Sequence, residues 1–223
     1  MQIKSEILIV DDHPIFRRGL AQLINEEQDM GVCGEAEDVD EAKKAIGKLK
    51  PDMVIVDISL KDRSGMELLR YIMEKYPQLP SLVLSMHDET LYAERVLRAG
   101  ARGYIMKQEM TGNVTQAIRQ VLKGKIYASD SIVESMLGKL TDNRTCDISE
   151  NAVDKLSNRE LEVFQMIGKG FGRKEIAEML NLSVKTIGTY RENIKKKLNL
   201  KNSSELMKHA FEWVRLQNSN SMQ

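Results

Sequence analysis

Short hydrophobic runs alternate with segments of helical periodicity along the first half of the chain. The runs cover residues 7–10, 32–36, 53–56, 82–84 and 104–106, and most of the segments between them carry apolar residues three or four positions apart. A run such as 53–56, which has no polar member, is typical of a strand buried on both faces of a parallel sheet. Five runs separated by helices therefore predict an α/β domain built from strand–helix–strand units.

This alternation stops after Gly124. Residues 139–151 are polar without a hydrophobic period, so we expect a linker there, and residues 126–140 favour a helix outside both cores. From Asp154 onward only helical periods remain, and Ser157 and Ser183 are suitable helix caps. The predicted organisation is an α/β domain over 1–124, a linker over 125–152, a four-helix domain over 153–217 and a disordered tail over 218–223.

Charge is distributed unevenly although the whole chain of 223 residues has a formal net charge of zero. The net charge is −3 over 1–124, −2 over 125–152 and +5 over 153–217. A basic C-terminal domain in a neutral chain indicates a polyanionic partner. The sequence has no signal peptide and no run near the roughly 18 apolar residues of a membrane span, so we expect a cytoplasmic protein, with Cys33 and Cys146 as free thiols.

Polar side chains follow four of the five hydrophobic runs. The carboxyl ends of parallel strands meet at one edge of an open sheet, which is where ligands bind. Three carboxylates there would repel one another, and a hard cation such as Mg²⁺ would relieve this. A carboxylate can also attack phosphorus, and a metal ion and an ammonium group would stabilise the transferring phosphoryl group. The residues concerned are Asp11, Asp12, Asp57, Ser85 and Lys107.

Each of these side chains has an expected role. Asp57 is the candidate nucleophile, Asp12 a direct metal ligand and Asp11 a ligand through water. The carbonyl of Ser59 would complete the metal shell, and Lys107 and Ser85 would contact phosphoryl oxygens. Taken singly, Asp11 or Asp12 is typical of a helix cap and Lys107 of a solvated lysine, so the prediction depends on their conjunction. His87 is interpreted as structural.

The first domain resembles the receiver domain of two-component response regulators. The resemblance rests on "ILIVDDH", "MVIVDISL…SG", "SLVLSMHDE" and "GARGYIMK" within residues 6–123. It implies a doubly wound parallel sheet in the order 2-1-3-4-5, a phosphoacceptor at Asp57, a switch hydroxyl at Ser85 and a switch aromatic at Tyr104. It also implies phosphotransfer from a sensor histidine kinase. Lys61 stands where the family usually has proline.

Residues 157–214 resemble a LuxR-type helix-turn-helix domain, and the two modules together resemble the NarL/FixJ class. The resemblance of this domain rests on the segments "LSNRELEV", "GKGFGRKEIAEMLNLSVKTI" and "NIKKKLNLKNSSEL". A helix over 184–197 would bury Ile187, Ile194 and Leu198 and turn a basic face to the major groove. The expected DNA contacts are Lys185, Thr186, Gly188, Thr189, Arg191, Glu192, Lys195 and Lys196.

The last helix carries apolar residues that either close the domain core or form a dimer interface, and the two roles are compatible. The resemblance implies dimerisation through Leu206, Ala210 and Trp213. Gly188 departs from the longer side chain of many relatives, either to let the backbone approach DNA or as tolerated drift.

These observations favour a response regulator in which phosphorylation frees or dimerises the C-terminal domain for DNA binding and transcription control. The expected partners are a histidine kinase, double-stranded DNA, a second copy of the chain and RNA polymerase. We expect no enzymatic activity beyond aspartyl phosphorylation and self-dephosphorylation. The main alternative is a phosphorylation-independent DNA-binding regulator. An aspartyl-phosphate phosphatase would need a second acid at Ser59, and a ligand-sensing LuxR-type regulator would lack the acidic set.

Overall fold

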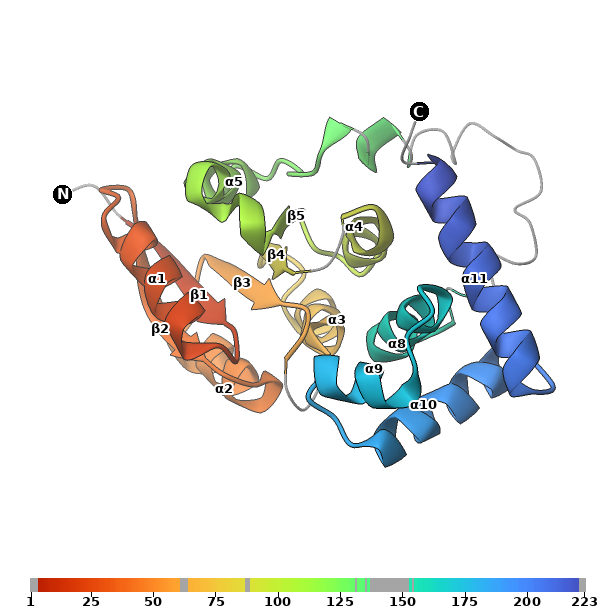
Figure 1. The fold of residues 1–223 in the computed structure, drawn as a ribbon. Helices are drawn as coiled ribbons and strands as arrows, with labels where there is room; N and C mark the ends of the chain where they lie inside the picture. Colours follow the sequence, from red (N-terminus) through yellow and green to blue (C-terminus); the bar gives the residue numbers. More distant parts are fainter. Residues whose placement is uncertain are drawn as a thin grey trace. The chain divides into compact units, whose positions relative to one another are not determined.

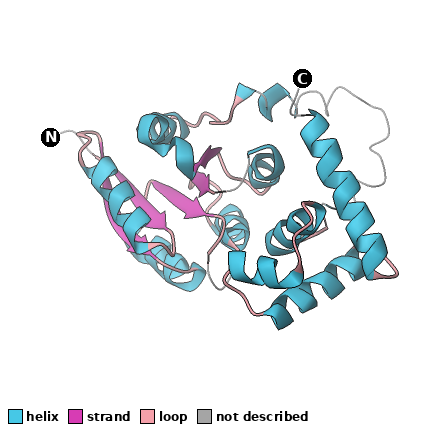
Figure 2. Cartoon of the chain, viewed as in Figure 1, coloured by secondary structure: helices cyan, strands magenta, loops and turns pink. Residues whose placement is uncertain are grey.

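The computed structural model describes residues 4–60, 64–86, 89–130, 132–134, 136, 153 and 155–220. The chain divides into two units, residues 1–143 and 144–223, and each is treated by itself below. Strands occur in the N-terminal unit, and the described part of the C-terminal unit is built from helices and short connections (Figure 2). Lys61, His87 and the expected linker over 139–151 lie outside the described residues.

The N-terminal unit is a five-stranded parallel sheet in the order β2-β1-β3-β4-β5, which confirms the predicted topology (Figure 1). The chain passes from β1 to β2 on one side and then crosses to β3 on the other side of β1. The carboxyl edge between β1 and β3, where the strand order changes direction, is therefore the expected ligand site. The strands are β1 (Ser5–Val10), β2 (Met30–Ala36), β3 (Met53–Asp57), β4 (Ser81–Ser85) and β5 (Gly103–Met106).

Helices cover both faces of this sheet. On one face, α1 and α5 pack over alternate residues of the central strands, among them Ile7, Ile9 and Ile55, which are almost fully buried. The other face carries α2, α3 and α4, which adjoin β2, β3 and β5 respectively. Burial on both faces explains the unbroken apolar runs 7–10, 53–56 and 82–84, whereas β2 is mostly half-buried and Glu35 in it is exposed. The helices are α1 (Pro14–Asn25), α2 (Val39–Leu49), α3 (Gly65–Lys75), α4 (Glu89–Arg98) and α5 (Met110–Leu122), and a short 3₁₀ helix, η1 (Lys107–Glu109), precedes α5.

The C-terminal unit contains the four predicted helices. They are α8 (Asn158–Gly168), α9 (Arg173–Met179), α10 (Val184–Lys197) and α11 (Ser203–Asn220). Ser157 begins α8 with the predicted capping box, because its hydroxyl accepts from the Glu160 N–H and the Glu160 carboxylate accepts from the Ser157 N–H at 2.7 Å. The same carboxylate binds Lys197 Nζ at 2.5 Å and so ties the end of α10 to the start of α8.

Helices α8 and α11 approach so closely that a glycine is required between them. A Cβ added to Gly168 would lie 2.4 Å from the Ala210 carbonyl oxygen and 2.6 Å from Val214 Cγ2. The rings of Phe164 and Trp213 pack beside this contact at 5.7 Å between centroids. The sequence prediction did not identify Gly168, because nothing in the local pattern shows which helices will touch.

Two boundaries differ from those expected. Ser129 begins the helical segment after α5: the Ile132 N–H donates to its hydroxyl at 3.4 Å, so residues 126–128 are not helical. Tyr127 instead forms a parallel β-bridge with Gly103. At the other end α11 includes residues 218–220, which were expected in the tail, and residues 221–223 lie outside the described part.

Replacing Gly168 with alanine is expected to destabilise the C-terminal unit by about 1–3 kcal/mol, the usual cost of overpacking. Unfolding by urea can be followed through the fluorescence of Trp213, the single tryptophan. Gly188→Ala is the matched control, because its Cβ meets nothing within 4 Å and alanine gains about 1 kcal/mol over glycine inside a helix. Equal stability of Gly168→Ala and the native chain would contradict the close helix contact.

Candidate functional site

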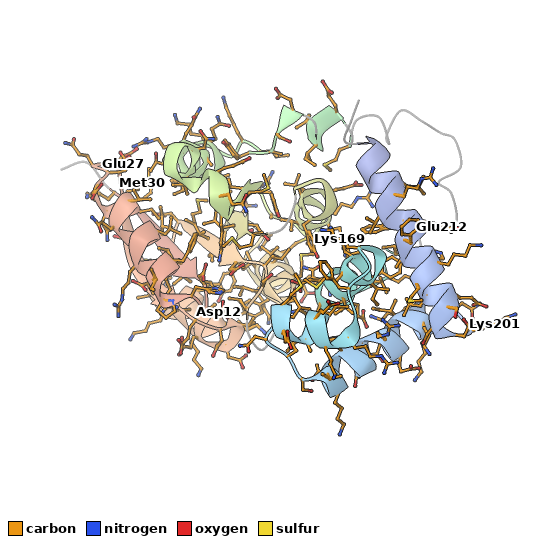
Figure 3. All side chains as sticks on the ribbon, in the orientation of Figure 1. Asp12, Glu27, Met30, Lys169, Lys201 and Glu212 are labelled. Atoms are coloured by element: carbon orange, nitrogen blue, oxygen red, sulfur yellow. The ribbon has the colours of Figure 1, made fainter. Side chains whose placement is uncertain are left out.

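The strand ends bring the predicted polar residues to one edge of the sheet. Val10 pairs with Val56 across β1 and β3, so Asp11 and Asp57 are neighbours one position later. Asp57 pairs with Leu84, and Ser85 pairs with Met106, the residue before Lys107. Asp12, one residue beyond Asp11 and labelled in Figure 3, lies at the same edge.

Lys107 joins two of the carboxylates. Its Nζ lies 2.6 Å from Asp11 Oδ2 and 2.7 Å from Asp57 Oδ2, and all three side chains are at least 97% buried. The ammonium group also lies 4.2 Å from the centroid of the Phe16 ring, on α1. A buried charge is tolerated when it is paired and hydrogen-bonded, and this triad meets that condition. Nothing in the sequence marks Phe16 as part of the site, since an aromatic residue in a helix is usually ordinary core.

Backbone N–H groups that follow β3 in the chain orient Asp57 and close the turn after it. Its Oδ1 accepts from the Ser59 N–H at 3.0 Å, and the Gly65 N–H closes the loop by donating to the Ile58 carbonyl at 3.0 Å. A Cβ at Gly65 would lie 2.2 Å from the Asp57 carbonyl oxygen, so the turn can form only with glycine. Burial raises the pKa of Asp57, the Lys107 ammonium opposes this shift, and the Asp11 carboxylate adds to it.

Asp12 and His13 complete the group of possible metal ligands. Each of Asp11, Asp12, His13 and Asp57 offers a ligand atom, and these atoms all lie within 4.8 Å of one another. Asp12 Oδ1 is buried and makes no hydrogen bond, although His13 Nδ1 lies 2.9 Å away. A buried carboxylate oxygen in that position fits a cation with oxygen ligands. His13 was not predicted to belong to the site, although its place directly after the acidic pair was a signal for it.

Ser85 and Tyr104 are both buried. Ser85 has no exposed surface at the end of β4, and Tyr104 in the middle of β5 is 1% exposed. Tyr104 therefore lies inside the unit in this structure, on the strand that leads into Lys107. The hydroxyl expected from the sequence thus lies at the end of β4, which pairs with the strand of Asp57. The expected aromatic ring lies on β5, the strand that leads into Lys107.

Helix α10 has the predicted buried stripe and a mixed outer surface. Ile187, Ile194 and Leu198 are buried, as expected. The exposed positions among the expected DNA contacts are Lys185, Thr189, Glu192 and Lys196, and the partly buried ones are Thr186, Gly188 and Lys195.

Several of the expected DNA contacts are hydrogen-bonded, ion-paired or buried in the free protein. Thr186 belongs to the helix cap, since its N–H donates to the Ser183 hydroxyl at 3.0 Å and the two hydroxyl oxygens lie 2.8 Å apart. Glu192 pairs with Lys195 at 2.9 Å, which offsets its repulsion of phosphate. Arg191 is only 8% exposed, and burial together with the charge of Arg173 lowers the pKa of its guanidinium. Arg191, which the sequence led us to expect as a phosphate contact, is therefore buried in the free protein.

The residues expected at a dimer interface lie in the core of the C-terminal unit. Leu206 and Ala210 are fully buried, and Trp213 packs against Phe164. Of the two compatible roles expected for Leu206 and Ala210, the structure of the single chain shows the first, closure of the core. The exposed apolar side chains of α11 are Met207, Phe211 and Leu216.

The raised pKa of Asp57 predicts that this carboxylate destabilises the metal-free fold. Its charged form costs free energy at pH 7, and the cost disappears as the pH falls below the carboxyl's ordinary range, where the group is neutral in both states. Asp57→Asn should therefore raise the free energy of unfolding in EDTA at pH 7, with no gain near pH 3. Excess Mg²⁺ should stabilise the native chain more than the variant.

Urea unfolding of the receiver monitored by circular dichroism would measure this. Glu74→Gln, an exposed change on α3, is the control and should alter the stability by less than about 0.5 kcal/mol. A lower stability of Asp57→Asn at pH 7 would contradict the interpretation of the site as electrostatically strained.

Comparisons with known proteins match both units. Residues 7–119 match the family described as response regulator receiver domain, and residues 154–210 match the bacterial regulatory proteins of the luxR family. The chain is 37% identical over 209 residues to the oxygen regulatory protein NreC of Staphylococcus haemolyticus, covering 92% of this chain and 96% of that protein. The NreC protein of Staphylococcus aureus strain JH9 is 37% identical over 210 residues, with the same coverage.

Two solved structures show the same architecture. The RcsB response regulator of Salmonella typhimurium is 28% identical with a TM-score of 0.55, covering 94% of this chain and 98% of that one. RcsB of Salmonella enterica serovar Typhimurium, bound to the promoter P1flhDC with the phosphomimetic BeF₃⁻, is 29% identical with a TM-score of 0.56, covering 93% and 98%. The chain therefore belongs to the two-component response regulators of the NarL/FixJ class, phosphorylation-regulated transcription regulators with a receiver domain and a LuxR-type DNA-binding domain.

Proposed function

We propose that Asp57 accepts a phosphoryl group from a sensor histidine kinase and that this controls DNA binding by α10. The observation that carries the proposal is the buried triad of Lys107, Asp11 and Asp57 beside the unsatisfied Asp12 oxygen. One oxygen of Asp57 is oriented by the Ser59 N–H and the other pairs with Lys107. A fixed carboxylate next to a cation is suited to attack phosphorus and to stabilise the charge that is transferred.

Mg²⁺ would be held by Asp12 and Asp57 directly, by Asp11 through water and by the Ser59 carbonyl. When bound, the ion neutralises charge on the phosphoryl oxygens and reduces repulsion among the three carboxylates. Lys107 would shift its hydrogen bond from the Asp57 carboxylate to the phosphoryl group. The charge of the modified Asp57, up to about −2, would exceed that of the carboxylate, so Lys107 and the Ser85 hydroxyl would move toward it.

Switching would pass through β5. Lys107 follows this strand directly, and Tyr104 lies within it, so displacement of Lys107 acts on the strand and on the packing of the Tyr104 ring. Tyr104 is already buried, and the proposed change is therefore a repacking of the ring within the unit rather than its entry from solvent.

DNA recognition would use the exposed face of α10. Lys185 and Lys196 are exposed and would contact phosphates, while Thr189 and Glu192 are exposed and could reach base edges. The Thr189 hydroxyl donates to the Lys185 carbonyl at 3.3 Å, which leaves its methyl group for a thymine methyl. A Cβ added at Gly188 would meet nothing within 4 Å, so there is room at this position for the backbone to approach DNA closely.

Dimerisation on DNA would use the exposed side of α11 rather than its buried side. Met207 and Phe211 are four residues apart, 53% and 61% exposed, and therefore adjacent on the helix surface. Two copies of this helix could pair through these side chains while Leu206 and Ala210 stay in the core.

Phosphate labelling tests the central proposal. The native chain incubated with Mg²⁺ and a small acyl-phosphate donor should become labelled, Asp57→Asn should not, and EDTA should prevent labelling of the native chain. Comparison of the labelled and unlabelled forms on genomic DNA fragments should then show tighter binding by the labelled form. Persistent labelling of Asp57→Asn would refute the assignment of the phosphoacceptor.

Phe211→Ser tests the dimer surface. Because Phe211 is exposed in the single chain, the variant should fold normally, but the dissociation constant of the dimer formed with beryllofluoride should rise about tenfold or more, as for an aromatic interface residue. Sedimentation velocity measures this. Met73→Ser, a similarly exposed change on α3, is the control. An unchanged dimer constant for Phe211→Ser would exclude this face.

A further inference from the structure

The segment that follows α5 turns back along the receiver sheet. Helix α5 ends at Leu122, and Gly124, just beyond the C-cap Lys123, has a left-handed φ of 76°. The Gly124 N–H donates to the Val121 carbonyl at 2.9 Å and the Lys125 N–H donates to the Gln120 carbonyl at 3.0 Å. This pair of bonds is the Schellman motif, which fixes the direction in which a chain leaves a helix. Residues 125–128 are thereby directed to the outer side of β5.

Tyr127 then pairs with β5 through its backbone. The Tyr127 N–H donates to the Arg102 carbonyl at 2.9 Å, and its carbonyl accepts from the Tyr104 N–H at 3.0 Å. These two bonds form a parallel bridge opposite Gly103. β5 is the last strand in the sheet order, so without this bridge its outer hydrogen-bonding groups would form an open edge. The isolated bridge of Tyr127 covers this part of the edge.

Gly103 is the residue that allows this approach. A Cβ there would lie 2.9 Å from the Tyr127 carbonyl oxygen and 3.1 Å from Tyr127 Cβ. The third near atom, Leu82 Cδ1 at 2.8 Å, is the end of a flexible side chain and can move. The backbone of Tyr127 cannot move without breaking its bridge, so the glycine is specifically required for the pairing of residue 127.

The bridge places the linker in direct contact with the strand that carries the switch residues. Tyr104 donates one of the two hydrogen bonds of the bridge. Lys107, three residues later, binds the Asp57 carboxylate at 2.7 Å. On the other side, Ser129 caps the next helical segment only two residues after Tyr127. One rigid four-residue strand therefore connects the acid site with the point where the linker begins.

We propose that the pairing of Tyr127 with β5 is the coupling element between the acid site and the linker. In the resting form the bridge holds the start of the linker against the sheet. Movement of Lys107 toward a phosphoryl group displaces β5, while residue 125 stays fixed by the end of α5, so the two bridge hydrogen bonds weaken and the linker is released. This inference rests on the function proposed for Asp57, but it concerns residues outside that site.

Amide hydrogen exchange of the full chain would detect this release. The N–H groups of Tyr104 and Tyr127 are the two donors of the bridge. With Mg²⁺ and beryllofluoride, their protection should fall together by about tenfold or more, as for a locally opened segment. If the amides of residues 57–59 respond to beryllofluoride while those of Tyr104 and Tyr127 do not, the coupling is refuted and the phosphoacceptor assignment stands. If no amide near Asp57 responds, the proposed function itself fails.

A reciprocal experiment uses the binding of beryllofluoride as the readout. Tyr127→Pro removes the donor to Arg102, and Tyr127→Phe, the matched control, keeps the backbone. Because coupling between two sites is reciprocal, loss of the bridge should tighten beryllofluoride binding about fivefold or more, and the control should leave it unchanged. Isothermal titration calorimetry measures both.

Gly103→Ala provides a second route to the same result. It displaces the Tyr127 backbone without removing its N–H, and it should tighten beryllofluoride binding in the same direction as Tyr127→Pro. Circular dichroism establishes that each variant is folded. Unchanged or weaker binding by folded Tyr127→Pro and Gly103→Ala would overturn the proposal.

Discussion

The ammonium group of Lys107 between Asp11 and Asp57 is the interaction on which the receiver unit depends. Both carboxylates are almost fully buried at the end of apolar strands, where an unpaired charge would cost several kcal/mol. Lys107 offsets that cost, but the pKa of Asp57 is still raised, so the compensation is incomplete. The fold thus stores an excess of negative charge at one point, and a metal ion or a redistribution of hydrogen bonds can relieve it.

The position of this triad in the sheet explains how a local charge can affect distant segments. Asp11 and Lys107 directly follow β1 and β5, and Asp57 is the last residue of β3, so the triad links the centre of the sheet to its last strand. β4, which ends in the buried Ser85, lies between β3 and β5. A strand in a packed core does not deform gradually, and a shift of Lys107 is transmitted along β5 as a unit. The bridge between Tyr104 and Tyr127 lies at the outer edge of β5, opposite the edge that pairs with β4.

The sequence was sufficient to predict the sheet, its order through the resemblance, and the convergence of Asp11, Asp57, Ser85 and Lys107. The sheet follows from the spacing of hydrophobic residues along the chain. The convergence of these side chains follows from the rule that the carboxyl ends of parallel strands lie at the same edge of a sheet. Phe16, Gly103 and Gly168 could not be predicted, because each is determined by contacts between segments far apart in the chain or by the close approach of backbones. Helical period alone did not show that Arg191 is buried, or which of the two compatible roles, closing the core or forming a dimer interface, Leu206 and Ala210 would take.

The burial of Arg191 also changes the physical picture of the DNA-binding surface. A helix whose outer face carries Lys185 and Lys196 but also a Glu192–Lys195 pair is less basic than its sequence implies. Phosphate attraction by one α10 helix is then modest, since each neutralised phosphate contributes only one step in the salt dependence of binding. Two copies of the domain would double the number of such contacts without any new recognition element. Weak single-copy binding is the condition under which a switch that releases or pairs the domains can control occupancy of DNA.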